Sequence, residues 1–219
     1  MNMFKKIFKL TLANIATIYL ISLMKTIIIN GLNITNENSL VIISVMTYLM
    51  GYVILFRVLK LNYRSLLIKL NLRLIIITLL IAIGYVLLIN VLIGIFLNVL
   101  PGESLYGLIS PNTLPTGIYA GITVFIITVF IAPIFEELIY RKIMLSILLN
   151  KYSKYKAIFI QALAFGIFHL DIKQGIYAVI FAIVSGCLYI KTENIRTCIL
   201  LHSSINLINF LGILIFIQR

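Results

Sequence analysis

Long apolar runs separated by short polar stretches make up almost the whole chain. A helix that spans a membrane needs about 20 largely apolar residues with no charge near its centre. Residues 10–29, 38–59 and 74–100 fit that template. The runs are solid apolar blocks without the alternation of a membrane barrel, so the pattern predicts helices and excludes strands.

The second half of the chain contains further apolar runs. Residues 104–135 carry no charge, but three prolines between positions 101 and 115 indicate that residues 101–116 form a loop. A fourth span therefore begins near Gly117. The remaining runs, of which the first is short for a span, are residues 156–170, 174–190 and 197–217. The sequence predicts an all-α, polytopic transmembrane helix bundle of about seven spans, within a range of six to eight.

The composition agrees with this fold class. The 219 residues are 62% hydrophobic and 11% charged, with a mean hydropathy of +1.15. A soluble domain is roughly 45–50% apolar and about 25% charged, so a single water-soluble core could not bury this much apolar surface. Cys187 and Cys198 lie in or beside apolar segments, where they indicate neither a disulfide framework nor a zinc ribbon.

The basic residues indicate the orientation in the membrane. The chain has 18 Lys and Arg against 6 Asp and Glu, a formal net charge of +12. These bases lie between the apolar runs, as membrane topology requires, so we do not expect nucleic acid as a partner. With a cytoplasmic N-terminus, fifteen of the eighteen lie on the inner side, which favours a multi-pass protein of the cell membrane in that orientation. The bases left outside are Lys25, Lys173 and Arg219.

Two adjacent carboxylates, Glu136 and Glu137, lie in or at the end of the fourth apolar run. Each would cost several kcal/mol in lipid unless it were paired or faced a wet cavity. Arg141 follows Glu137 by four residues on the same helix face and is its expected partner. Glu136 has no partner in the sequence and is a candidate general base. The alternative is that the helix ends at Phe135 and both carboxylates lie among the headgroups.

Both histidines of the chain lie inside predicted spans. Phe165 precedes His169 by four residues and is placed to pack against its ring, while Asn206 follows His202 by four residues on the same face. A single buried histidine is usually a hydrogen-bonded core residue, but ionisable groups inside a membrane are candidates for function. Asp171, close to His169, either orients it or marks the end of the helix.

In order along the chain these residues spell Glu136-Glu137-x-x-x-Arg141, Phe165-x-x-x-His169 and His202-x-x-x-Asn206. The set resembles the three motifs of the CAAX protease and bacteriocin-processing family, also called the Abi family, whose members are intramembrane endopeptidases. Each motif alone is weak, but all three in order, using both histidines, are specific. The resemblance makes residues 117–217 the catalytic helix core and residues 1–116 the variable N-terminal transmembrane helices.

The resemblance implies a catalytic role for four of these residues. Glu136, helped by His169, would activate the attacking water. His202 and Asn206 would donate hydrogen bonds to the developing oxyanion.

Two supporting features also follow from the resemblance. Glu137 and Arg141 would hold the site in shape. The family is usually labelled a metalloprotease, which implies a divalent metal, expected to be zinc, with Glu136, His169 and His202 as its ligands. A metal-free glutamate mechanism fits the same residue types.

We therefore expect a CAAX-type intramembrane endopeptidase that hydrolyses a peptide bond in a membrane-associated or secreted peptide or precursor. Its partners would be this peptide or protein substrate and the lipid bilayer. Two alternatives stay open: a non-catalytic membrane protein that gives self-immunity to a bacteriocin by binding, and a small transporter with a proton relay. The transporter is disfavoured because the polar residues crowd into the last hundred positions and no inverted halves are visible.

Overall fold

The computed structural model describes residues 3–58, 69–97, 118–169 and 172–217. These residues form seven continuous helices and no strand, as the sequence predicts. The expected loop at residues 101–116, the span ends at residues 59, 98–100 and 170, Asp171 and Arg219 lie outside the described residues. The elements are α1 (Met3–Gly31), α2 (Glu37–Val58), α3 (Leu72–Leu97), α4 (Ile118–Phe125), η4 (Ile126–Ile131), α5 (Ala132–Glu137), η5 (Leu138–Leu145), α6 (Ser146–Leu149), α7 (Lys154–Phe168), α8 (Ile172–Thr192) and α9 (Ile195–Ile217).

The helices agree with a membrane bundle. The segments long and apolar enough to cross a bilayer are Asn38–Arg57, Leu72–Ile89, Gly121–Leu149 and Gln174–Thr192. The other predicted spans form α1, α7 and α9. Helix α7 has 15 residues, a length of roughly 22 Å, and is the short span that the sequence predicts.

Several of these helices have an asparagine as N-cap, whose side chain accepts a hydrogen bond from an amide of the first turn. The Oδ1 atom of Asn36 accepts from the Ser39 amide at 3.2 Å, and that of Asn71 accepts from the Leu74 amide at 2.8 Å. Each bond satisfies an amide that has no helical partner in the first turn. Asn194 does the same for α9, directly after the turn in which Glu193 adopts a φ of 51°.

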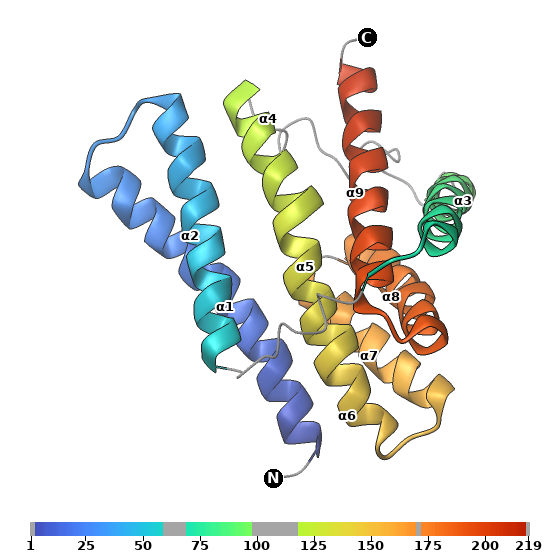
Figure 1. The fold of residues 1–219 in the computed structure, drawn as a ribbon. Helices are drawn as coiled ribbons and strands as arrows, with labels where there is room; N and C mark the ends of the chain where they lie inside the picture. Colours follow the sequence, from blue (N-terminus) through green and yellow to red (C-terminus); the bar gives the residue numbers. More distant parts are fainter. Residues whose placement is uncertain (1–2, 59–68, 98–117, 170–171, 218–219) are drawn as a thin grey trace.

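The continuous helix α4–η4–α5–η5–α6 occupies the middle of the bundle (Figure 1). The pair α1 and α2 lies on one side of it, and α7, α8 and α9 lie on the other. Helix α7 packs on α8, and α3 packs on α9. The central helix is therefore in contact with both groups, and side chains on its different faces reach different partners.

The central helix is wound more loosely in two stretches, the π-helical segments η4 and η5. At the end of η4 the Ala132 amide bonds to the Ile127 carbonyl, five residues back. The next amide in that register would belong to Pro133, which has no N–H. The carbonyl of Thr128 is therefore left without a helical donor. Such π segments often occur at functional sites.

Close packing of α7 on α8 depends on glycine. A Cβ atom built on Gly166 would overlap the side chain of Val179 and lie 2.8 Å from the carbonyl oxygen of Gly175. The two helices could not approach this closely with a larger residue at this position. The Cβ of Gly84 in α3, by contrast, would meet nothing within 4 Å.

We predict that Gly166→Ala lowers the stability of the bundle by about 1–3 kcal/mol, since the extra methyl group must displace backbone. The matched Gly84→Ala variant should melt at or slightly above the wild-type temperature, because alanine favours helix. Thermal unfolding in detergent measures both. Equal melting of Gly166→Ala and the wild type would contradict the close helix contact.

Candidate active site

A fully buried carboxylate, Glu137, joins three helices at the centre of the bundle. Its Oε1 atom accepts a hydrogen bond from Nδ1 of His202 in α9 at 2.9 Å. Its Oε2 atom accepts from Oγ of Ser185 in α8 at 2.9 Å and pairs with Nε of Arg141 at 3.0 Å. The ion pair with Arg141 is the one predicted from the spacing, and both side chains are 0% exposed.

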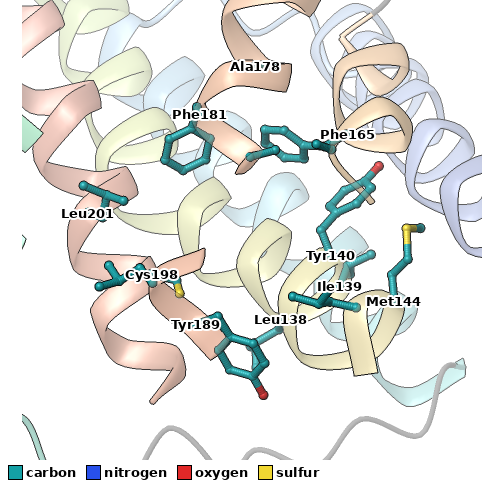
Figure 2. Close-up of a cluster of buried hydrophobic side chains, with 14 of the residues drawn as sticks. Leu138, Ile139, Tyr140, Met144, Phe165, Ala178, Phe181, Tyr189, Cys198 and Leu201 are labelled. Atoms are coloured by element: carbon teal, nitrogen blue, oxygen red, sulfur yellow. The ribbon is translucent and has the colours of Figure 1, made fainter. Parts of the chain in front are cut away.

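The Arg141 guanidinium lies between two aromatic rings. Its central carbon is 4.7 Å from the centroid of Phe165 in α7 and 5.0 Å from that of Phe181 in α8. Figure 2 shows both rings in the cluster formed by the central helix, α7, α8 and α9, with Phe165 beside Tyr140. A flat, weakly hydrated guanidinium can stack on aromatic rings, which a lysine ammonium does less well. The rings and Glu137 together hold the cation away from water.

Glu136 is also inside the bundle, and its partner comes from α9. The helix continues past it to Leu149, and the residue is only 7% exposed. The alternative that places both carboxylates among the headgroups is therefore wrong. The Oε2 atom of Glu136 lies 4.0 Å from Nε2 of His202, a pairing that no spacing in the sequence reveals.

His202 lies between the two carboxylates. A carboxylate can only accept, so Nδ1 of His202 carries the hydrogen directed at Glu137, and Nε2 is the nitrogen that faces Glu136. The imidazole also packs on Phe181, with 4.6 Å between ring centroids. The orientation of the ring is thus fixed by Glu137, as a carboxylate fixes the histidine of a hydrolytic triad.

His169 directly follows the last residue of α7, and the Phe165 ring lies next to it. Its Nδ1 donates to the Phe165 carbonyl at 3.0 Å, and its ring meets the Phe165 ring edge-on at 4.9 Å, as the sequence predicts. The Phe165 and His202 rings are 6.2 Å apart. Phe165 is therefore a neighbour of both imidazoles, and in the described contacts no hydrogen bond or ion pair joins His169 to Glu136.

Asn206 lies one turn after His202 on α9 and reaches the central helix. Its Nδ2 donates to the Thr128 carbonyl at 2.8 Å. This is the carbonyl that the π register and Pro133 leave without a helical donor, so the side-chain amide takes the place of the missing N–H. The second hydrogen on Nδ2 is left for another acceptor.

The expected zinc ligands Glu136, His169 and His202 are not all in contact with one another in the described structure. Within the described part of the chain, no group of three or more His, Cys, Asp or Glu side chains could hold a metal ion. Glu136 and His202 face each other as a pair, whereas protein zinc sites use at least three protein ligands. The described residues bring two of the three expected zinc ligands together, and we derive no step through a metal.

Several neighbours of the site were missed at the sequence level. Ser185 is a lone serine within the apolar run of α8, and a serine hydroxyl in a helix usually bonds to its own helix backbone. Phe181 and Thr128 carry no sequence signal, because an aromatic ring or a backbone carbonyl in a membrane helix is ordinary. Only the long-range packing of α8 and α9 identifies them.

The family profile described as type II CAAX prenyl endopeptidase Rce1-like matches residues 118–208. Residues 118–208 of the chain are therefore similar to the CAAX protease family. The matched segment runs from α4 into α9 and contains all six predicted site residues, while α1, α2 and α3 precede it. No curated protein and no solved structure matches the chain. The six predicted site residues thus lie in the segment that is similar to a CAAX endopeptidase.

The buried ion pair between Glu137 and Arg141 should contribute to the stability of the protein. We predict that Arg141→Met destabilises the protein by about 3 kcal/mol, because Glu137 would be left as a buried charge without its cation. Adding Glu137→Gln to Arg141→Met should recover part of this loss, since the uncompensated charge is then gone. Thermal unfolding of the two single variants and the double variant measures the coupling. Additive losses would contradict a mutual pair.

Proposed function

We propose that the Rce1-like segment hydrolyses a peptide bond in a membrane-associated or secreted peptide or precursor. The observation that carries this proposal is the alignment of Glu136, His202 and Glu137, in which a buried carboxylate faces an imidazole whose other nitrogen is held by a second carboxylate. Such a series of groups moves and stabilises protons, as peptide hydrolysis requires. The family match supports the same class of reaction.

The reaction begins with a water molecule beside Glu136. The Glu136 carboxylate takes one proton from the water as its oxygen forms a bond to the carbonyl carbon of the peptide, and the carbonyl π electrons move onto oxygen. The resulting oxyanion accepts hydrogen bonds from protonated Nε2 of His202 and from the second N–H of Asn206. Glu137 stabilises the positive imidazole through Nδ1.

The second half of the reaction breaks the C–N bond. The oxyanion re-forms the carbonyl, the bonding electrons leave with nitrogen, and the proton held by Glu136 passes to the leaving amine. Glu136 is then a free carboxylate again. Glu137 and Arg141 exchange no proton in this scheme and act as positioning residues. His169 borders the site through Phe165 and would help Glu136 activate the water, the role that the resemblance implies.

The site must be reached by both water and peptide from within a membrane. The central helix is one of the segments long and apolar enough to cross a bilayer, and we infer the cytoplasmic N-terminus from the distribution of basic residues. In this orientation the basic residues around Lys151 and Lys154 lie near the inner headgroups. A peptide already bound to the membrane would be held at this surface without diffusing through water.

We predict that Glu136→Gln abolishes peptide cleavage while the protein remains folded, since an amide cannot take the proton of the water. Peptide termini in cells that express the variant or the wild type at equal membrane levels measure this. The matched control is Glu193→Gln, the same change at an exposed turn between α8 and α9, which should keep full activity. Full activity of Glu136→Gln would overturn the mechanism. A function that survives Glu136→Gln without new termini would favour binding, as in bacteriocin immunity.

Zinc requires its own experiment. Because Glu136 and His202 form a pair with no third ligand among the described residues, we expect chelation followed by dialysis to leave cleavage within about twofold of the untreated protein. Elemental analysis of the same sample reports any bound metal. About one zinc per chain, lost in His202→Ala together with activity restored only by added zinc in the wild type, would support the metalloprotease expectation instead.

A further inference from the structure

Helix α2 precedes the segment matched by the family profile, yet it packs against the central helix directly beside Glu136. The Tyr52 ring stacks on the Phe135 ring with centroids 4.3 Å apart and planes 13° from parallel. Phe56 meets the other side of this contact, edge-on to Phe135 at 5.0 Å. Phe135 is the residue before Glu136, so the stacked pair fixes α2 at the height of the candidate base.

The position of Glu136 on its helix places it between two groups of helices. Phe135 faces α2, and Glu137 faces α8 and α9. Successive residues point about 100° apart on a helix, so Glu136 points between these two faces. His202 faces Glu136 from the α9 side at 4.0 Å. On the α2 side, Tyr52 and Phe56 pack on Phe135, the residue before Glu136.

Tyr52 brings a buried hydroxyl to this space. The residue is 0% exposed, and its hydroxyl lies beside that of Tyr48 but forms no hydrogen bond of standard geometry with any described residue. Its ring lies against Phe135, the residue directly before Glu136 on the central helix. A buried hydroxyl without a partner is costly and calls for a bound group.

We propose that the hydroxyl of Tyr52 binds the water that Glu136 activates. The inference rests on the proposed function and adds a catalytic group from outside the matched segment. The water has two hydrogens and two lone pairs. Donating one hydrogen to Glu136 and the other to the Tyr52 oxygen leaves a lone pair free to attack the peptide carbon. No proton is transferred to the phenol, so the stoichiometry of hydrolysis is unchanged.

The variant that tests this is Tyr52→Phe, which keeps the ring and its stacking on Phe135 and removes only the hydroxyl. We expect kcat to fall about tenfold, as for one lost hydrogen bond in the transition state, with KM within about twofold of the wild type. The melting temperature should change little, because the hydroxyl forms no hydrogen bond of standard geometry with a described residue. A steady-state assay on the purified protein and thermal unfolding in the same detergent measure the three quantities.

The matched control is Tyr85→Phe on α3. Tyr85 is also buried, but its hydroxyl donates to the Tyr177 carbonyl at 2.9 Å, away from Glu136. Its loss should lower the melting temperature and leave kcat unchanged. A purely structural role for Tyr52 would give the same result as this control and would overturn the inference.

Two further outcomes separate the inference from the proposed function. If Glu136→Gln is inactive and Tyr52→Phe has wild-type kcat and KM, the function stands and the water site at Tyr52 is wrong. A rise in KM at unchanged kcat would also overturn it, since that pattern indicates a contact with the substrate in the ground state. If Glu136→Gln is active, both the function and the inference fail.

Discussion

The rest of the site depends on the burial of one carboxylate, Glu137. A charge enclosed in an apolar bundle is tolerated only if cations and donors surround it. Arg141, Ser185 and His202 meet that need from the same helix, from α8 and from α9. Because each bond requires its own helix to be in place, the charge determines how α8 and α9 pack on the central helix and how the His202 ring is turned.

A second polar contact fixes α9 one turn further along. The missing N–H of Pro133 exposes the Thr128 carbonyl, and Asn206 satisfies it. With Glu137 binding His202 and Thr128 binding Asn206, α9 is attached to the central helix at two successive turns. The π register of η4 is therefore part of the site, because a regular α-helix would direct this carbonyl at a different amide.

The helices and one ion pair of the candidate site could be predicted from the sequence. The contacts between residues far apart in the chain could not, because sequence spacing does not show them. The helices follow from apolar runs, and the Glu137–Arg141 pair follows from a spacing of four, since both are local properties. Glu136 has no local partner, and its contact with His202 joins residues far apart in the chain. The division into residues 1–116 and 117–217 stays a prediction.

The position of Glu136 explains why the candidate site can depend on a helix, α2, that contains none of the motif residues. All six motif residues come from the central helix, the C-terminal end of α7 and α9, and His202 of α9 faces Glu136. The side toward α2 is aromatic, through Tyr52 stacked on Phe135. Hydrolysis needs a held water as well as a base, and a wall of apolar rings alone cannot hold one. A hydroxyl on that wall meets the requirement without adding a charge to the membrane, which would cost far more.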